Sequence, residues 1–381
     1  MAKKVLIFST AYLPLIGGAE VAVKEITKRL SGEFSFDLIC ARIKKELPTQ
    51  EKIGVVQVYR VGRGRGRIDK LLLPWRGLAL AKRLHRQNKY DLIWAIMASF
   101  GGLAALFFKK RFIGVPYVLT LQEGDTPAHI AARAVWLGPY WRQMFSRADA
   151  ITAISQFLKD YAAKRGAKVT PEVIPNGAQF LSASSGESLR VRLNIKPEEK
   201  LIVHHGRLVP KNGLVYLVEA IGLLPDSGYR SHFKLLLIGS GPEKKKLEQK
   251  AAEIKSGERI IFLPEMPHEE ALKYLAVADV FVRPSLSEGL GNVFLEAMAA
   301  GVPVIGTRVG GIVDFLRDGE TGLFCEAKNP RSIAEKINLF FSDEILRQRL
   351  IANARKLVEE KYNWDSLAPK MENIFNRLII K

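Results

Sequence analysis

The fold is decided by one stretch in the second half of the chain, residues 280–303, which reads VFVRPSLSEGLGNVFLEAMAAGVP. The apolar run Val280–Arg283 predicts a strand, and a Gly-containing turn separates it from a helix expected from about Val293 to Ala300. Gly301, followed by Val302-Pro303, ends that helix. The stretch therefore predicts a strand, turn and helix of the kind that builds parallel sheets.

Two carboxylates belong to this stretch. Glu288 lies in the turn and Glu296 in the first turns of the helix, so both are expected at the carboxyl end of the strand. The backbone N–H groups of residues 291–294 start the helix and offer a site for an anion such as a phosphate. The two residues also fit a plainer interpretation, in which Glu288 is a solvated loop residue and Glu296 complements the helix dipole.

A second cluster follows the apolar run Leu201–Val203 and reads HGRLVPKNG at residues 205–213. Arg207 and Lys211 lie there on a Gly-bounded loop at the end of a predicted strand. Two cations in that place can hold a diphosphate and stabilise its charge as it departs. Solvated loop cations are the alternative.

A glycine pair, Gly17-Gly18, separates the first predicted strand from a helix expected at Glu20–Leu30. Glycines there let the backbone approach a ligand, but the spacing is not G-x-G-x-x-G, so a nicotinamide or flavin cofactor gains no support. The sequence also contains no D-x-D pair, no H-E-x-x-H, no G-x-S-x-G and no Walker phosphate loop. We therefore expect neither a metal ion nor an organic cofactor.

Short apolar runs alternate with amphipathic stretches of helical length along the 381 residues, which is the pattern of parallel sheets covered on both faces. Clear examples of predicted strands are Leu92–Ile96, Tyr117–Leu121, Ala150–Ala153, Leu201–His205 and Val302–Gly306, and a helix is predicted at His268–Ala276, after Pro267. A polar patch at Ser182–Gly186 interrupts the alternation and is the best linker candidate. The sequence thus predicts an α/β protein with two doubly wound, Rossmann-like domains that face a central cleft.

Charge and cysteine content limit the cellular compartments in which the protein is expected to work. The net charge of +19 is concentrated in residues 1–180, which contribute +16. Cys40 and Cys325 lie too far apart for a CxxC or metal-ligand spacing, so a reduced, cytoplasmic setting is expected. The apolar run Val5–Phe8 is too short for a signal peptide, and Leu92–Phe108 falls short of the roughly 20 residues of a membrane span.

Taken in order, these clusters resemble the GT-B glycosyltransferases, specifically the large retaining family 4. The resemblance covers nearly the whole chain. It includes Pro14-x-x-Gly17-Gly18-Ala19-Glu20, the run Ala148-Asp149-Ala150 to Ser155, Ile174-Pro175-Asn176-Gly177, Gly206-Arg207-Leu208, Gly239-Ser240-Gly241-Pro242-Glu243, the Glu288 and Glu296 pair, and Thr307-x-x-Gly310-Gly311. The resemblance implies metal-independent transfer of a sugar, with retention of configuration, from a nucleotide-diphosphate sugar to a hydroxyl of a glycan or lipid-linked acceptor.

The resemblance also implies that the two halves of the chain bind different substrates. Residues 1–181 are expected to form the acceptor-binding domain and residues 187–364 the nucleotide-sugar-binding domain. A C-terminal helix at residues 365–381 is expected to cross back to the first domain.

Individual residues match the motifs of the family. Arg207 matches the arginine on the donor diphosphate, Glu288 the glutamate beside the sugar hydroxyls, and Glu296 the glutamate on the nucleotide ribose. The other donor-binding residues that the resemblance implies are Gly17, Gly18, Gly289, Leu290, Gly291 and Asn292. In a transfer of this kind the leaving phosphate itself takes the proton of the acceptor hydroxyl.

Two positions depart from the family pattern. Many members carry the diphosphate lysine five residues after the arginine, where this chain has Asn212, so Lys211 is expected to take that role. Many members also carry a sugar-contacting histidine at the position of Gln122, which we place with Asp125 on the acceptor side. A glutamine forms hydrogen bonds but does not titrate, so no general base is assigned there.

Other activities stay open at this point. A sugar-nucleotide epimerase or phosphorylase would share the phosphate clamp, and a non-catalytic nucleotide-sugar binder would fit Gln122. A glycosidase that uses Glu288 and Glu296 fits less well, because hydrolysis needs no diphosphate clamp. No recognised nucleic-acid-binding module accompanies the positive charge, so no nucleic-acid partner is expected. Base recognition is expected near residues 239–241 and 263–266, largely through backbone groups.

The basic first half also predicts where the protein works. Trp75 and Phe112 are candidates for exposed aromatic residues, and Gly62–Arg67 predicts a mobile basic loop. Such residues can dock on an anionic bilayer, where each cation near the surface contributes about 1 kcal/mol. We expect peripheral attachment to the inner, cytoplasmic face of the membrane, with a merely basic soluble protein as the alternative. The other cations concerned are Lys82, Arg83, Arg86, Lys89, Lys109, Lys110 and Arg111.

Overall fold

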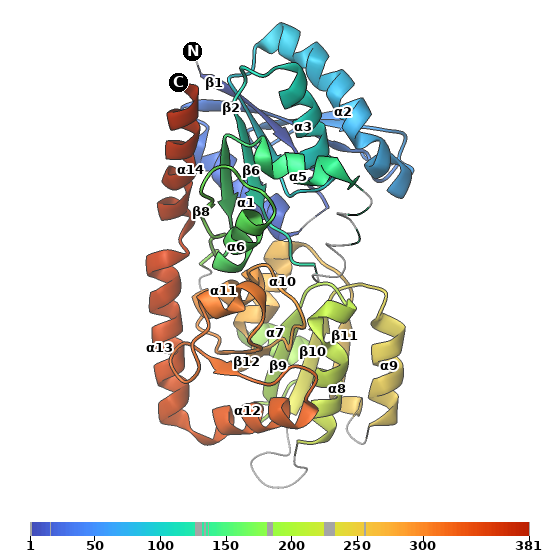
Figure 1. Ribbon diagram of the computed structural model, residues 1–381. Helices are drawn as coiled ribbons and strands as arrows, with labels where there is room; N and C mark the ends of the chain where they lie inside the picture. Colours follow the sequence, from blue (N-terminus) through green and yellow to red (C-terminus); the bar gives the residue numbers. More distant parts are fainter. Residues whose placement is uncertain are drawn as a thin grey trace. The chain divides into compact units, whose positions relative to one another are not determined.

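The computed structural model describes residues 2–15, 17–125, 132, 135, 137–180, 186–224, 233–254 and 257–380 (Figure 1). The chain divides into two compact units. Unit 1 comprises Met1–Glu123, Pro127–Asn176 and Trp364–Lys381, and unit 2 comprises Gly124–Thr126 and Gly177–Asn363. Both units are α/β with a mainly parallel sheet, as the alternation of apolar runs and helical stretches predicts.

Unit 1 is built on an eight-stranded sheet, counted over the described residues, in the order β3-β4-β2-β1-β5-β6-β7-β8. The strands pair in parallel except β3 and β4, which are antiparallel. Because β1 pairs with both β2 and β5, the strand order reverses at β1, and the loops after β1 and β5 meet. The strands are β1 Lys3–Phe8, β2 Phe34–Ala41, β3 Gln50–Ile53, β4 Val56–Val61, β5 Leu92–Ile96, β6 Tyr117–Leu121, β7 Ala150–Ala153 and β8 Glu172–Val173.

The last helix of the chain, α14 (Trp364–Ile379), belongs to unit 1 and packs on α1 (Gly18–Leu30). The Phe375 ring lies 5.6 Å from that of Phe34 and 5.4 Å from that of Trp94, so α14 completes the core of this unit. Among the described residues, the other helices of unit 1 are α2 Arg67–Asn88, α3 Phe100–Arg111, α5 Pro139–Ser146 and α6 Gln156–Lys164.

Unit 2 is built on a parallel sheet of six strands within the described part of the chain, in the order β11-β10-β9-β12-β13-β14. The strands are β9 Lys200–His205, β10 Phe233–Ile238, β11 Ile260–Leu263, β12 Val280–Val282, β13 Val304–Gly306 and β14 Leu323–Phe324. The order reverses at β9, which pairs with β10 on one side and β12 on the other. Open α/β sheets bind ligands outside the carboxyl ends of the strands at such a reversal.

Helices cover both faces of this sheet. Val280 and Val282 face the cluster that includes Leu217 of α8 and Ile337 of α12, whereas Phe281 faces Phe294 of α11 at 5.0 Å between ring centroids. This alternation follows from the two-residue period of a strand. The helices of unit 2 are α7 Gly186–Arg192, α8 Leu214–Gly222, α9 Lys244–Glu253, α10 His268–Ala276, α11 Asn292–Ala299, α12 Pro330–Ser342 and α13 Glu344–Lys361.

The boundaries of the units differ from the predicted ones by a few residues. The chain leaves unit 1 after Asn176, before the predicted boundary at residue 181, and returns to it at Trp364. The two segments of unit 2 that follow Asn176 and precede Trp364 are hydrogen-bonded to each other, since the Ala178 amide donates to the Tyr362 carbonyl at 2.8 Å. Of the predicted linker, residues 182–185 lie outside the described residues, and α7 begins at the next residue.

The basic segment Gly62–Arg67 is held in place, contrary to the prediction of a mobile loop. The buried Asp69 carboxylate accepts hydrogen bonds from the backbone amides of Arg63 at 3.1 Å and Arg65 at 2.6 Å, and pairs with Arg76 at 2.8 Å. Because Asp69 binds the backbone of the segment, the arginine side chains stay exposed.

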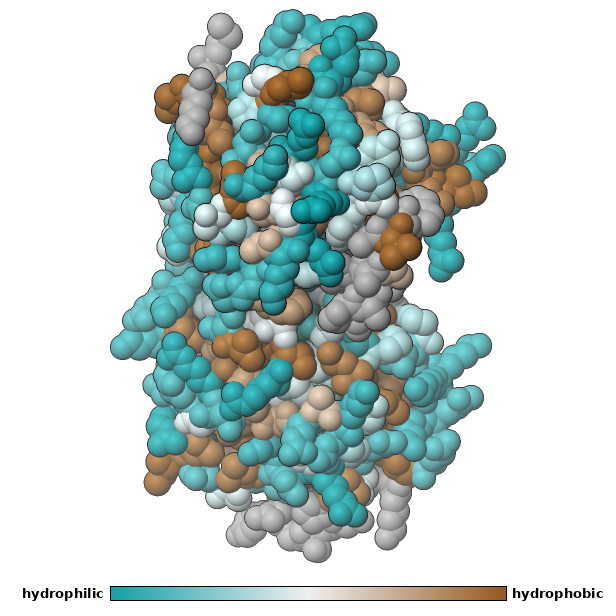
Figure 2. Space-filling view, in the orientation of Figure 1, coloured by the Kyte–Doolittle hydropathy of each residue, from teal (hydrophilic) through white to brown (hydrophobic). Residues whose placement is uncertain are grey.

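Apolar side chains interrupt the charged surface at the N-terminal part of α2. Ile68, Leu71 and Trp75, spaced by one and two helical turns, are 50%, 39% and 57% exposed. Figure 2 shows brown side chains among teal ones over this part of α2, at the right of the view. The prediction for Phe112 is wrong, because its ring is half-buried and packs against that of His85 at 4.6 Å between centroids.

Candidate functional site

The predicted site residues of unit 2 gather where its strand order reverses. Arg207 and Lys211 follow β9, and Glu288 follows β12, the strand that pairs with β9. The turn at Gly206 has φ of 138°, a backbone conformation that favours glycine. A Cβ atom on Gly206 would lie 2.4 Å from Nη2 of Arg283, so glycine also leaves room for that side chain.

Glu288 is 9% exposed, and a cation lies near each of its carboxylate oxygens. Oε1 lies 4.0 Å from Nζ of Lys211 and accepts a hydrogen bond from the Gly289 amide at 3.3 Å. Oε2 accepts a hydrogen bond from Nη1 of Arg283 at 3.4 Å. A buried carboxylate between two cations is a paired charge, which fits a binding site better than the solvated loop residue of the plainer interpretation.

Lys211 and Asn212 have different roles in the loop after β9. Nζ of Lys211 donates to the carbonyl of Gly124, in the short segment that clusters with unit 2, at 2.6 Å. The pKa of Lys211 lies below its ordinary value, because burial lowers it by more than the nearby Glu288 carboxylate raises it. Asn212 is 2% exposed, and its Nδ2 donates to the carbonyl of Arg207 at 2.6 Å. Lys211 therefore faces the carboxylate, while Asn212 fixes the backbone beneath Arg207.

Neighbouring loops support the loop that carries Arg207. The Leu208 amide donates to the Ser240 carbonyl at 2.8 Å, and a Cβ atom on Gly239 would lie 2.1 Å from the Gly206 carbonyl oxygen. The Arg207 side chain is itself exposed. A guanidinium held on a fixed backbone but open to solvent is suited to bind an incoming anion.

Glu296 is 5% exposed on α11 and faces two histidines of unit 2. Its Oε1 lies 3.2 Å from Nε2 of His268, and its Oε2 has no hydrogen-bond partner among the described residues. The His205 ring lies 6.1 Å from that of His268, between centroids. Burial lowers the pKa of His205 to about 4, so this ring is neutral at neutral pH. A buried carboxylate oxygen without a donor is costly, which favours a hydroxyl of a bound ligand as its partner.

The turn between β12 and α11 is braced by the loop after β13. The Gly311 amide donates to the Glu288 carbonyl at 3.2 Å, and a Cβ atom on Gly310 would lie 1.8 Å from that same oxygen. Helix α11 begins at Asn292, one residue before the predicted start, so the amides of residues 291–293 stand at its N-terminus.

The remaining predicted residues lie elsewhere. Gly17 and Gly18 belong to unit 1, where they start α1. Gln122 is buried in unit 1, and its Oε1 accepts a hydrogen bond from Asn176 at 3.0 Å. Asp125, predicted together with Gln122, clusters with unit 2 instead, because its carbonyl accepts a hydrogen bond from Ser287 at 3.0 Å.

Sequence reasoning missed the contribution of three side chains. Arg283 ends an apolar strand. A cation at the end of such a run is rarely buried without a partner, and this was the signal that could have identified it as a site residue. His205 ends a strand and His268 starts a helix, both as predicted, but nothing in their local sequence places them beside Glu296.

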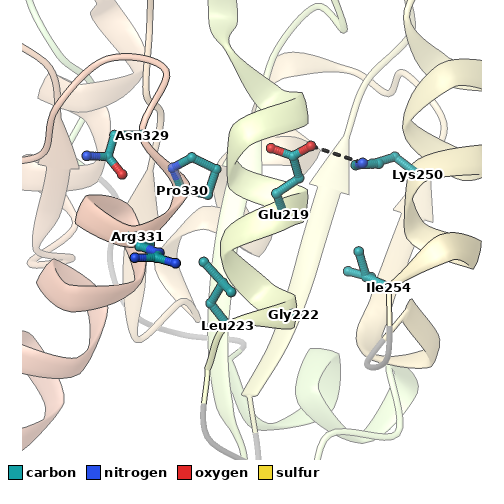
Figure 3. Close-up of a pocket in the computed structure, with 8 residues that line it drawn as sticks. All are labelled: Glu219, Gly222, Leu223, Lys250, Ile254, Asn329, Pro330 and Arg331. Atoms are coloured by element: carbon teal, nitrogen blue, oxygen red, sulfur yellow. Dashed lines mark ion pairs between the residues drawn. The ribbon is translucent and has the colours of Figure 1, made fainter.

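A hollow of unit 2 lies apart from this site. A pocket of about 530 Å³ lies between α8, α9 and α12, with the Glu219 and Lys250 ion pair on one wall and Leu223, Ile254 and Arg331 around it (Figure 3). None of the predicted site residues lines it. Within the described ranges, no three His, Cys, Asp or Glu side chains are placed to hold a metal ion, and no helix is long and apolar enough to cross a membrane.

Two family models match the chain. The model described as glycosyl transferases group 1 matches residues 186–357, and the model described as glycosyltransferase family 4 matches residues 16–179. Among curated proteins, TuaC of Bacillus subtilis, a glycosyltransferase named for teichuronic acid biosynthesis, is 33% identical over 75% of this chain and 70% of its own. An uncharacterised glycosyltransferase of Methanocaldococcus jannaschii is 29% identical over 98% of this chain and 97% of its own.

A solved structure agrees on the fold. HepE of Anabaena, in complex with UDP-glucose, has a TM-score of 0.81 and 19% identity, and the match covers 98% of this chain and 99% of HepE. At this identity the likeness concerns architecture, and it confirms the predicted fold of two Rossmann-like domains.

Substitutions of Lys211 and Asn212, the two neighbouring loop residues, should differ in how much they lower the stability of the protein. Asn212→Ala removes the Nδ2 donor and leaves the Arg207 carbonyl with the Val209 amide alone, at 3.1 Å, so the free energy of unfolding should fall by about 0.5–1.5 kcal/mol. Lys211→Ala should cost less, because Glu288 keeps Arg283 as its counter-ion. Urea unfolding of both variants checks the order, and a larger loss for Lys211→Ala would contradict the role given to Asn212.

Proposed function

The chain belongs to the group 1 glycosyltransferases of the GT-B fold, and on this premise we propose that it is a retaining enzyme that uses a nucleotide-diphosphate sugar. It transfers the sugar to a hydroxyl of a glycan or lipid-linked acceptor without a metal cofactor. The observation that carries the proposal is the Glu288 carboxylate held between Lys211 and Arg283, with Arg207 exposed on the adjoining loop. A carboxylate is suited to sugar hydroxyls and the cations to a diphosphate.

The cations neutralise the charge of the leaving group. Arg207 and Lys211 lie on one loop of fixed backbone, and the first amides of α11 stand across the same strand reversal. As the bond between the sugar and the phosphate breaks, negative charge grows on the diphosphate, and donors already in place stabilise it. These residues take the part that a metal ion plays in other enzymes, so no cofactor enters the proposal.

The acceptor hydroxyl attacks the oxocarbenium-like sugar from the face that the diphosphate leaves. Its proton passes to the leaving phosphate, because Gln122 cannot titrate and instead binds Asn176 in unit 1. This assignment gives Gln122 a hydrogen-bonding role and no role as a base.

The nucleotide is bound by the second carboxylate and by the loops after β10 and β11. Glu296, with Oε1 near His268 and Oε2 without a partner among the described residues, is suited to the two ribose hydroxyls. Ser240 donates to the Glu265 carboxylate, which brings the loops at residues 239–241 and 263–266 together where the base is expected. HepE, with the same architecture, binds UDP-glucose, which supports a nucleotide-sugar donor.

The exposed side chains of unit 1 support binding of the protein to a membrane surface. Ile68, Leu71 and Trp75 are exposed on one face of α2, next to the loop that presents Arg63 and Arg65. Of the predicted cations, Lys109 is occupied by Asp149 at 2.8 Å, whereas Arg83, Arg86, Lys89, Lys110 and Arg111 are exposed. Apolar side chains beside cations favour an anionic bilayer. We place the enzyme on the cytoplasmic face of the membrane, where a lipid-linked acceptor would lie.

Glu288→Gln should strongly reduce transfer and leave the chain folded but less stable, because the substitution opens no cavity yet takes the carboxylate partner of Arg283 away. The donor is first selected by thermal shift from UDP-glucose, GDP-mannose and other nucleotide sugars. Turnover, measured as release of nucleoside diphosphate in the presence of acceptor, should fall by about a hundredfold, equivalent to ~2.7 kcal/mol in the barrier.

The matched control is Glu320→Gln, which removes an exposed carboxylate of unit 2 that pairs with Arg317. The control should keep wild-type turnover. Turnover of Glu288→Gln within about threefold of wild type would contradict the sugar contact, and donor binding without any release would mark a non-catalytic binder.

Attachment to membranes is checked by sedimentation with vesicles. The protein should sediment with vesicles that contain anionic phosphatidylglycerol, stay in solution with phosphatidylcholine alone, and dissociate at high salt. Replacing Arg63, Arg65 and Arg67 by Gln should weaken binding without disturbing the loop, since Asp69 binds its backbone.

A variant that replaces three exposed cations of α13, Arg355, Lys356 and Lys361, by Gln is the control for net charge. It should keep binding. Equal sedimentation of the wild type with both kinds of vesicle, or equal losses in the two triple variants, would contradict the assigned surface.

A further inference from the structure

One cation of the site, Arg283, is buried where a strand ends. Its backbone amide donates to the Ile305 carbonyl at 3.1 Å, which continues the pairing of β12 with β13. The residue is 7% exposed, and its Nη2 donates to the His205 carbonyl at 3.2 Å. Nη1 donates to Oε2 of Glu288 at 3.4 Å. The guanidinium therefore joins the end of β9 to the turn after β12.

Charges around Arg283 explain how the cation is accommodated. Burial lowers the pKa of Arg283, while Glu288 and then Glu296 raise it. A buried cation is stabilised only when opposite charge and hydrogen-bond acceptors surround it. Both carboxylates of the site supply that charge, and Nε of Arg283 has no hydrogen-bond partner in the part of the chain that the structure describes.

Arg283 and Lys211 serve Glu288 in different ways. Lys211 extends from the loop that carries Arg207, so a bound diphosphate attracts its ammonium group and competes with Glu288 for it. Arg283 is fixed to the sheet and has a second acceptor in the His205 carbonyl. Its contacts with Glu288 and with the His205 carbonyl do not involve Lys211.

We propose that Arg283 is a positioning residue that holds the Glu288 carboxylate in the orientation in which it binds the sugar part of the donor. The proposal rests on the function proposed above, in which Glu288 contacts the sugar. It assigns Arg283 to recognition of the sugar and not of the nucleoside diphosphate. A guanidinium that binds two acceptors fixes an orientation that a single charge would not.

A double-mutant cycle tests this assignment. Arg283→Gln, Glu288→Gln and the double variant are compared for the dissociation constants of UDP and UDP-glucose, or of GDP and GDP-mannose if that donor stabilises the wild type more. Arg283→Gln should weaken binding of the nucleotide sugar about tenfold, through loss of one charge-assisted contact, and change binding of the nucleoside diphosphate by less than about threefold.

The cycle should be strongly non-additive. In the Glu288→Gln background, Arg283→Gln should cause no further loss of nucleotide-sugar affinity or turnover, because Arg283 acts through Glu288. Arg283→Lys keeps the buried charge with a single contact and should recover part of the affinity. It also serves as the second variant if Arg283→Gln does not fold.

Additive losses, or equal losses for the nucleoside diphosphate and the nucleotide sugar, would overturn the proposal, since both indicate a general structural or phosphate-binding role. Arg317→Gln, which removes an exposed arginine of unit 2, is the control and should bind like the wild type. The same variants are also compared without ligand by their melting temperatures. The fall in melting temperature of the double variant should be smaller than the sum of the falls of the two single variants.

The ligand-free cycle separates the two hypotheses. If the wild type bound no nucleotide sugar, the proposed function would fail whatever the cycle showed. If the wild type bound a nucleotide sugar but Arg283 and Glu288 were uncoupled both with and without ligand, only the role of Arg283 would fail.

Discussion

The pairing of Glu288 with two cations depends on the reversal of strand order at β9. Because β9 pairs with β10 on one side and β12 on the other, the loops that carry Lys211 and Glu288 leave the sheet at the same edge. Each oxygen of the carboxylate then has one cation, Lys211 or Arg283. Without this reversal Glu288 would keep only Arg283, which ends the same strand, and would lose Lys211.

Much of the fold and part of the site were predictable because they depend on local sequence. The strands Leu92–Ile96, Tyr117–Leu121 and Ala150–Ala153 and the helix His268–Ala276 have the predicted bounds, since short apolar runs and a preceding proline set them. The positions of Arg207, Lys211 and Glu288 after strand ends followed from the same reasoning.

Contacts between distant segments were not predictable. Arg283 looked like part of a strand, and only the packing of β12 beside β9 brings it to the His205 carbonyl. The basic loop looked mobile because glycines alternate with arginines, but Asp69, a few residues later, binds its amides. Asn212 occupied the position of a family lysine, and its structural role is visible only in the hydrogen bond from its side chain to the Arg207 carbonyl. Such interactions depend on geometry that a motif does not encode.

Hydrogen exchange of the backbone amides tests whether the carboxyl edge of the sheet in unit 2 binds a nucleotide-diphosphate sugar. With a stabilising nucleotide sugar present, peptides that contain residues 206–212 and 288–294 should exchange more slowly, because the diphosphate and sugar occupy the amides at the start of α11. Peptides over the pocket between α8, α9 and α12 should not change. Protection confined to that pocket, or found in neither place while the ligand is bound, would contradict the account.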